Sequence, residues 1–274
     1  MPCEPRLAKS PAETTHDDGS RGAPPEPKVR FRDVSVWYGT RRALEGICLG
    51  IPEKQIFGII GPANSGKTTL LKCINRTIEF VPQSMVTGEV FVDGEEVSRI
   101  RNVFELRRRV GVVFPLPVGL PLSVFENVAY APRRAGVRDK NELAEIVERS
   151  LKDAMLWDEV KDRLQLLGTR LSGGQQQRLT LARALSHDPE ILCLDEFSIA
   201  IDPVTTMRIE DILRELKNRM TIVLVTNLVQ QARRLADQTA FFSSGRLIEV
   251  GATEKIFRQP DERLTWRFVT GDFG

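Results

Sequence analysis

The chain has 274 residues, of which 41% are hydrophobic and 28% are charged, the balance of an ordinary globular protein. Its net charge of +2 does not suggest a nucleic-acid-binding protein, and no apolar run approaches the roughly 18 residues that would mark a membrane span. The four cysteines are widely separated and show no metal-ligand spacing. We therefore expect one large globular domain or two small ones, with no nucleic acid as partner.

The first 27 residues differ in composition from the rest of the chain. They contain no aromatic residue and hold six of the sixteen prolines. Such a segment buries too little apolar surface to offset the entropy of ordering, and it lacks the apolar core of a signal peptide. We predict a disordered cytoplasmic tail over residues 1–27 and a folded domain over residues 28–274.

Three strands are predicted at the start of the folded domain. Apolar and polar residues alternate over 29–36, and Tyr38-Gly39 follows as a turn. Two further strands flank the polar turn at residues 52–54. The second of them, residues 56–60, is almost wholly apolar, which is typical of a strand covered on both faces in a parallel sheet.

A glycine-rich segment, "GPANSGKTT", follows this strand directly and opens a predicted helix. It fits the pattern G-x-x-x-x-G-K-[ST]. Gly61 and Gly66 allow the backbone to wrap closely, so that its amides and the helix N-terminus face phosphate groups. Lys67 supplies a cation to the β- and γ-phosphates, and Thr68 offers a hydroxyl to Mg²⁺. The alternative, a chance glycine-rich turn, is disfavoured by the flanking strand and helix. The predicted phosphate-binding residues are Gly61, Pro62, Ala63, Asn64, Ser65, Gly66, Lys67, Thr68 and Thr69.

A second apolar strand, residues 191–194, ends in an acidic pair. Asp195 is placed to hold Mg²⁺, often through water, and Glu196 to accept a proton from an attacking water molecule. A lone Asp-Glu pair is more often a solvated turn. Two acids at the end of a buried strand, in a chain with a phosphate-binding loop, favour the catalytic interpretation.

The segment "LSGGQQQR" places a serine and two glycines before a predicted helix, a typical anion-binding helix start. With this segment the chain resembles the ATP-binding cassette (ABC) ATPases, whose signature is LSGGQ. Ser172, Gly173, Gly174 and Gln175 match the signature residue for residue. The resemblance implies that the signature of one subunit caps the ATP held by the other. It therefore implies a head-to-tail dimer, with ATP and Mg²⁺ as cofactors.

Two further site residues follow from the same resemblance. Tyr38 lies where the family has its adenine-stacking aromatic residue, with Trp37 as the neighbouring candidate. Simple packing of a strand end is the alternative for both. Asp202, in "IDP", matches the aspartate of the family's D-loop.

A more specific resemblance, to one group within the family, extends over about Val29 to Gly274. "LWDEVKDRL", the triple-glutamine signature and the final "TGDFG" resemble the ATP-binding subunits of bacterial phosphate importers. This resemblance implies a peripheral protein on the cytoplasmic face of the membrane. Its partners would be a second ATP-binding subunit and membrane permeases, which would dock near Leu116 to Glu126. Phosphate as the solute rests on the resemblance alone, and direct contact with the solute is not expected.

The expected architecture is an α/β P-loop NTPase core with an antiparallel strand layer from the N-terminal region. A helical subdomain is expected over about Val103 to Leu164. One of its helices places six apolar residues on one face, which we predict to face the core. These are Leu143, Ile146, Val147, Leu151, Ala154 and Met155.

The chain also departs from the family at positions that sense the γ-phosphate. Where relatives have a glutamine that links water and metal, this chain has Pro115, which has no side-chain donor or acceptor. Where they have the switch histidine, it has Asn227, which can donate a hydrogen bond but cannot carry a positive charge. Phe197, Ile199 and Ile201 replace a proline, a serine and a leucine of neighbouring motifs. Since loss of a positioned polar group commonly costs about 10²–10³ in rate, we expect ATP hydrolysis with reduced turnover.

Three functions remain open from the sequence. The first is the energising ATPase of a phosphate importer. The second is a slow or inactive nucleotide-binding regulatory module that pairs with an intact paralogue. The third is a soluble cassette protein of DNA repair or translation, which is the weakest, because the chain has neither a long coiled-coil insert nor a second cassette.

Overall fold

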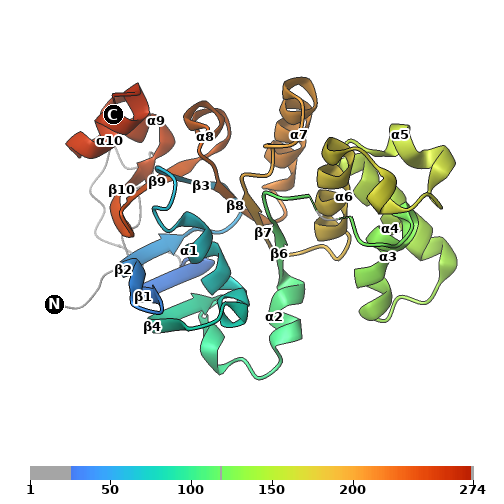
Figure 1. The fold of residues 1–274 in the computed structure, drawn as a ribbon, viewed down its shortest axis with the longest axis horizontal. Helices are drawn as coiled ribbons and strands as arrows, with labels where there is room; N and C mark the ends of the chain where they lie inside the picture. Colours follow the sequence, from blue (N-terminus) through green and yellow to red (C-terminus); the bar gives the residue numbers. More distant parts are fainter. Residues whose placement is uncertain (1–25, 118, 273–274) are drawn as a thin grey trace, which may run out of the picture. The chain divides into compact units, whose positions relative to one another are not determined.

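The computed structural model describes residues 26–117 and 119–272, which form two compact units (Figure 1). Of these residues, one unit comprises 26–106 and 223–272, and the other comprises 107–117 and 119–222. The tail predicted over residues 1–27 lies almost wholly outside the described residues. Of its last two residues, Pro27 is buried and Glu26 pairs with Arg30 at 3.3 Å.

The first unit contains an antiparallel sheet with the strand order β2-β1-β4-β5. Val29 of β1 lies opposite Ile51 of β2 and opposite Val92 of β4. The apolar members of the alternating segment 29–36 are buried, as the sequence pattern predicts. The strands are β1 (Val29–Tyr38), β2 (Arg41–Ile51), β4 (Ser84–Val92) and β5 (Glu95–Glu96).

A second sheet of this unit carries the phosphate-binding loop. Its strand order is β10-β9-β3-β8, and β9 runs parallel to β3 with Phe57 opposite Gln238. All five residues of β3 are buried, which confirms the prediction of a strand covered on both faces. The strands are β3 (Ile56–Ile60), β8 (Thr221–Val225), β9 (Gln238–Ser243) and β10 (Arg246–Ala252).

Six short helices complete the first unit. The ring of Phe268, in the last of them, stacks on that of Phe241 in β9, with centroids 4.9 Å apart. The helices are α1 (Lys67–Ile74), η1 (Thr77–Phe80), η2 (Val97–Arg99), α8 (Val229–Leu235), α9 (Thr253–Arg258) and α10 (Arg263–Thr270).

The second unit combines parallel strands with a group of helices. The strand order is β8-β7-β6, with Val110 of β6 (Val110–Val113) opposite Ile191 of β7 (Ile191–Asp195). The chain passes from this unit back to the first within β8. α2 (Val103–Arg109) carries the chain into the unit.

Three helices of the second unit pack against one another: α3 (Val124–Arg134), α4 (Lys140–Asp153) and α6 (Gly173–Leu185) (Figure 1). Of the six apolar residues predicted on one face of α4 and its end, four are buried, whereas Ile146 and Met155 are partly exposed. The remaining elements are α5 (Trp157–Val160), η3 (Lys161–Arg163), η4 (Gly168–Arg170) and α7 (Pro203–Leu216). The expected α/β fold class, with an antiparallel layer and packed helices, is confirmed.

Candidate functional site

The loop between β3 and α1 adopts a conformation that requires glycine at two positions. Gly61 has φ +150°, and a Cβ atom there would lie 2.1 Å from the carbonyl oxygen of Phe242. Gly66 is the N-cap of α1 with φ +99°, and a Cβ there would lie 2.5 Å from Leu44 Cδ2. The loop therefore packs closely against the rest of the unit, and no side chain caps the N-terminus of α1 with a hydrogen bond.

Lys67 is held inside this loop. The side chain is only 5% exposed, and its Nζ donates hydrogen bonds to the carbonyl oxygens of Gly61 (2.8 Å) and Pro62 (2.9 Å). Ser65 Oγ is also buried and has no hydrogen-bond partner among the residues that the structure describes. A buried cation, a buried hydroxyl and a helix N-terminus together fit the phosphate groups of a nucleotide.

Tyr38 lies beside the start of α1. Its hydroxyl is 3.1 Å from Thr69 Oγ1, with either atom as donor. Burial raises the pKa of Tyr38, although the hydrogen bond with Thr69 acts in the opposite direction. The structure thus brings Tyr38 to the phosphate-binding loop, as expected for an aromatic residue of the nucleotide site, whereas stacking on adenine stays a prediction.

Asn227 follows β8 in the same unit and is exposed. The preceding Thr226 donates its backbone N–H to Ile59 of β3 (3.2 Å), which places Asn227 next to the strand that leads into the loop. Thr226 Oγ1 also donates to Gln231 (2.9 Å) and accepts from the backbone N–H of Leu228 (3.0 Å). These contacts hold the turn that carries Asn227.

The acidic pair ends β7 in the second unit. Asp195 is buried, with 1% of its surface exposed, whereas Glu196 is partly exposed. Glu196 has a left-handed backbone with φ +47°, and its carbonyl accepts a hydrogen bond from the N–H of Ile199 (3.2 Å). A non-glycine residue in this conformation is uncommon and is enriched at functional sites. The environments of the two acids therefore suit different tasks, a fixed ligand and an accessible base.

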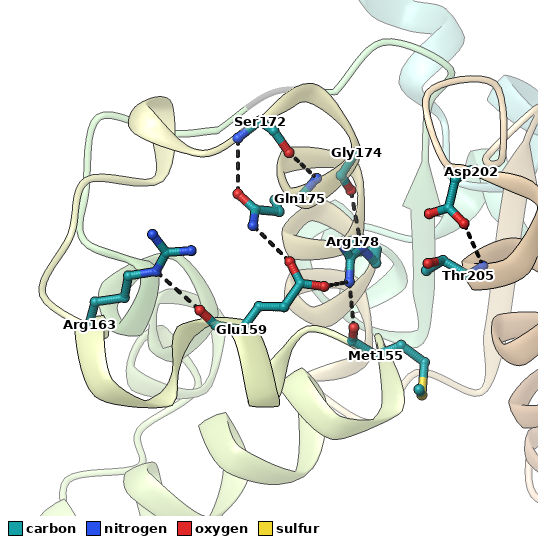
Figure 2. A network of polar contacts seen from close by, with 9 residues as sticks. All are labelled: Met155, Glu159, Arg163, Ser172, Gly174, Gln175, Arg178, Asp202 and Thr205. Atoms are coloured by element: carbon teal, nitrogen blue, oxygen red, sulfur yellow. Dashed lines mark hydrogen bonds and ion pairs between the residues drawn. The ribbon is translucent and has the colours of Figure 1, made fainter.

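The signature residues form the N-terminus of α6 (Figure 2). Ser172 is the N-cap and accepts a hydrogen bond from the N–H of Gln175 (3.3 Å), while Gln175 Oε1 accepts one from the N–H of Ser172 (3.0 Å). This reciprocal pair is a capping box. A Cβ on Gly174 would lie 2.9 Å from the carbonyl oxygen of Ala200, but a Cβ on Gly173 would meet no described atom within 4 Å.

Asp202 caps a helix, and Pro115 lies in the segment after β6. Asp202 is exposed and caps α7, since its Oδ1 accepts a hydrogen bond from the N–H of Thr205 (2.9 Å) (Figure 2). Hydrogen bonding by the side chain and then by the backbone of Thr205 lowers the pKa of Asp202. Pro115 follows β6, and the carbonyl of the preceding Phe114 accepts a hydrogen bond from Gln177 Nε2 (3.0 Å). The D-loop role of Asp202 stays a prediction.

Two site residues had no assignment from the sequence. Glu159 and Arg178 form an ion pair of 2.6 Å beside the signature, and Glu159 also accepts a hydrogen bond from Gln175 (Figure 2). The contacts with Arg178 and Gln175 lower the pKa of Glu159. In the sequence, "LWDEVKDRL" and the triple glutamine stand out as distinctive segments, but nothing indicates that they contact each other. That contact depends on the packing of α5 against α6.

Thr68 and Asp195, the predicted metal ligands, belong to different units, so their joint role stays a prediction. Across residues 26–117 and 119–272 there is no group of three or more His, Cys, Asp or Glu residues suited to a metal ion. Within the described helices, none is both long and apolar enough to cross a membrane.

Comparisons with known proteins identify the class. A family model described as ABC transporter matches residues 44–198. An ATP-binding cassette solved as a dimer with ADP and Pi covers 82% of this chain and 98% of its own, with a TM-score of 0.73 and 27% identity. A bacterial Atm1-family ABC exporter with ATP bound covers 91% of this chain and 43% of its own, with a TM-score of 0.75 and 24% identity, and supports the fold. The chain therefore belongs to the ABC transporter family, as an ATP-binding domain.

Among curated relatives, the phosphate import ATP-binding protein PstB of Bacteroides fragilis is 47% identical over 248 residues, 90% of this chain and 98% of the relative. The phosphate import ATP-binding protein PstB 1 of Bacillus licheniformis is 47% identical over 251 residues, 91% of this chain and 97% of the relative. The similarity to this group that the sequence motifs indicate is thus confirmed over nearly the whole chain.

Proposed function

We propose that the chain binds and hydrolyses ATP with Mg²⁺ as the energising subunit of an importer for inorganic phosphate. The observation that carries this proposal is the phosphate-binding loop with the buried ammonium of Lys67. It occurs in a chain that is 47% identical to phosphate import ATP-binding proteins along nine-tenths of its length. Both the nucleotide chemistry and the solute class follow from this combination.

Binding of the nucleotide is carried by the first unit. The amides at the start of α1 and the ammonium of Lys67 take the β- and γ-phosphates, and the ring of Tyr38 lies beside the loop to contact the base. Thr68 and Asp195 would hold Mg²⁺, which neutralises charge on the transferred phosphoryl group. The carbonyl contacts of Lys67 already hold its amine at the loop, so little ordering of that side chain is needed on binding.

Hydrolysis requires a base and a contact to the γ-phosphate. Glu196 is the proposed general base, since its partly exposed carboxylate follows the buried Asp195 at the end of β7. Asn227 donates a hydrogen bond to a γ-phosphate oxygen but adds no positive charge. Together with Pro115, this predicts a turnover below that of chains that carry the histidine and the glutamine.

A second ATP-binding subunit completes the site in this proposal. Gly173 is the first residue of α6, and a Cβ there would meet no described atom within 4 Å, so packing within this chain does not require a glycine. Close approach of a phosphate from a second copy accounts for the glycine. Exposed Ile199, Val204 and Met207, in and after the D-loop, supply apolar surface for the same contact.

The subunit would act at the cytoplasmic face of the membrane, bound to permease subunits. Leu116, at the start of the segment where docking is predicted, is an exposed apolar residue, and exposed Phe114 lies just before that segment. The solute would pass through the permeases, so contact between this chain and phosphate ion as cargo is not part of the mechanism.

The test of this function uses Lys67→Ala with Lys72→Ala as matched control. Both remove one lysine from α1, but Lys72 lies in the last turn, away from the loop. We expect Lys67→Ala to weaken Mg-ATP binding at least tenfold by calorimetry and to abolish ATPase activity, because the phosphates lose their nearest cation. Lys72→Ala should retain both properties.

Uptake of labelled phosphate completes the test, in cells that lack their own phosphate-import ATPase. The wild-type chain, expressed with its permease, should restore uptake and Lys67→Ala should not. Equal ATP affinity of wild type and Lys67→Ala would contradict the assignment of the loop. Tight ATP binding with no turnover, with or without the permease, would instead support the nucleotide-binding regulatory module.

A further inference from the structure

The two carboxylate oxygens of Glu159 each accept a hydrogen bond from a different residue of α6 (Figure 2). Oε1 accepts from Arg178 Nη1 at 2.6 Å, and Oε2 accepts from Gln175 Nε2 at 2.7 Å. Glu159 lies on α5, a helix of only four residues, and its own carbonyl accepts from Arg163 Nε at 3.1 Å. One side chain of α5 therefore binds both the first and the second turn of the signature helix.

Arg178 has a structural role that does not depend on Glu159 alone. Its side chain is 8% exposed, and it also donates to the carbonyl oxygens of Met155 (2.5 Å) and Gly174 (3.4 Å). The bond to Met155 joins α6 to the segment between α4 and α5, whereas the bond to Gly174 lies within α6. Because Arg178 keeps the carbonyl of Met155 as an acceptor, loss of the Glu159 carboxylate would leave part of this contact in place.

Gln175 depends on Glu159 in a different way, through the direction of its side-chain amide. Its Oε1 accepts from the backbone N–H of Ser172, and its Nε2 donates to Glu159. If the amide turned over, the NH₂ group would face the N–H of Ser172 and the oxygen would face the carboxylate of Glu159. The carboxylate thus selects the one orientation of Gln175 that closes the capping box.

From this geometry we propose that Glu159 is a positioning residue for ATP hydrolysis, acting through Gln175. It holds the first turn of α6, with the Ser172–Gln175 capping box, in the geometry in which that turn meets the ATP of the second subunit. The inference rests on the proposed function, since it assigns a task to a residue behind the signature. Glu159 itself touches no reacting atom.

Glu159→Gln tests the proposal, with Asp158→Asn as its matched control. In this variant the amide oxygen of residue 159 can accept from only one of the two donors, Arg178 or Gln175. The new NH₂ group faces the other donor and cannot accept from it. Asp158 is the preceding residue on α5; its carboxylate is 90% exposed and contacts only Lys161 among the described residues, at 3.4 Å. Both variants remove one negative charge from the same helix.

We expect Glu159→Gln to lower kcat roughly tenfold, the effect of losing one hydrogen bond to a charged group. Binding of Mg-ATP to the separated chain should change less than twofold, because Lys67 and its loop are untouched. Asp158→Asn should keep kcat within twofold of wild type. A wild-type kcat for Glu159→Gln, or an equal loss in Asp158→Asn, would overturn the proposal.

The route through Gln175 is tested by adding Glu159→Gln to Gln175→Ala. If Glu159 acts through Gln175, the double variant should have the kcat of Gln175→Ala alone, within twofold. If Glu159 merely holds the fold through Arg178, the two losses should multiply, and the positioning role is wrong.

A measurement that needs no nucleotide is the hydrogen exchange of the backbone N–H of Gln175, which donates a hydrogen bond to Ser172 Oγ. Protection of this N–H should fall in Glu159→Gln. It should return when Gln175→Glu is added, because the amide at position 159 then donates to the carboxylate at position 175, and that carboxylate accepts from the N–H of Ser172 to complete the capping box. Unchanged protection in Glu159→Gln would overturn the inference. Should that variant fail to fold, Glu159→Asp carries the same test, because it keeps the charge but is one methylene too short for both donors.

The two proposals fail separately. A wild-type chain that neither binds nor hydrolyses ATP contradicts the proposed function. An active wild type whose Glu159→Gln variant is equally active contradicts only the role of Glu159.

Discussion

At the scale of single residues, the group proposed to bind phosphate and the positions proposed to sense the γ-phosphate differ in chemistry. Lys67 is buried and already hydrogen-bonded within its loop, whereas Asn227 is exposed at the end of β8 and Pro115 has no polar side chain. Binding and turnover should therefore respond to different substitutions.

Reversion of both sensors is the sharpest prediction at this scale. We expect Asn227→His with Pro115→Gln to raise the steady-state ATPase rate by more than the product of the two single effects. Each single change restores a contact to only one side of the same reacting group, so the effects are coupled. ATP affinity should change little, because Lys67 and the loop backbone carry most of it.

The four proteins are compared at saturating Mg-ATP, and the affinity of each is measured by calorimetry. A wild type already as fast as the double variant would show that other groups replace the sensors, and the expectation of reduced turnover would be wrong.

The residues that the sequence could identify are those whose chemistry is local. Lys67 and Ser172 belong to contiguous motifs, and the motif itself dictates the loop and the cap. Glu159 could not be assigned in this way, because its two partners lie on another helix and the contact depends on how α5 packs beside α6.

At the scale of secondary-structure elements, the phosphate-binding loop is constrained by its neighbours. At Gly66 a Cβ atom would approach Ala43 O to 2.7 Å as well as Leu44 Cδ2, so β2 sets the space available to the start of α1. Conformation and crowding both demand glycine there.

Gly66→Ala, with Gly271→Ala as matched control, separates these two demands. Both glycines have positive φ (+99° and +87°), but a Cβ on Gly271 would meet no described atom within 4 Å. We expect Gly271→Ala to cost about 1 kcal/mol of stability, from the left-handed backbone alone. Gly66→Ala should cost about 3 kcal/mol and abolish ATP binding, because backbone must also move.

Denaturant unfolding and nucleotide binding are measured for both variants. If the Gly66→Ala variant binds ATP as well as Gly271→Ala does, β2 moves easily and does not constrain the loop.

The elements that could be predicted are those with a strong local pattern. β1 alternates and β3 is uniformly apolar, so the pattern of each indicates its burial. The sequence pattern does not predict β9 and β10. β9 pairs with β3, about 180 residues earlier in the chain, and no local window contains both strands.

At the scale of the whole molecule, His187 links stability to pH. It is one of two histidines in the chain; the other, His16, lies outside the described residues. Burial lowers the pKa of His187 below its ordinary value of 6.5, and the charge of Arg108 acts in the same direction. The nearby backbone of Arg183 and the charge of Asp188 oppose the shift.

The sign of the effect follows from proton binding. Below about pH 6.5 the unfolded chain takes up a proton that the folded chain binds less readily, so the free energy of unfolding decreases as pH falls. We expect stability to drop between about pH 7.5 and 5.5 in the wild type and to vary less in His187→Gln. The carboxylates with lowered pKa, such as Glu159 and Asp202, contribute only at more acidic pH.

Denaturant unfolding at several pH values measures this dependence, with His16→Gln as the matched control. A dependence that persists in His187→Gln and vanishes in His16→Gln would contradict the assignment to His187.

The strand order around β3 has a consequence for synthesis on the ribosome. Both neighbours of β3 in its sheet, β8 and β9, are translated long after it, and Gly61 packs against Phe242 of β9. A nascent chain that has extended only through the signature helix therefore cannot assemble its phosphate-binding loop. Translation products that stop before β9 would therefore lack a nucleotide site.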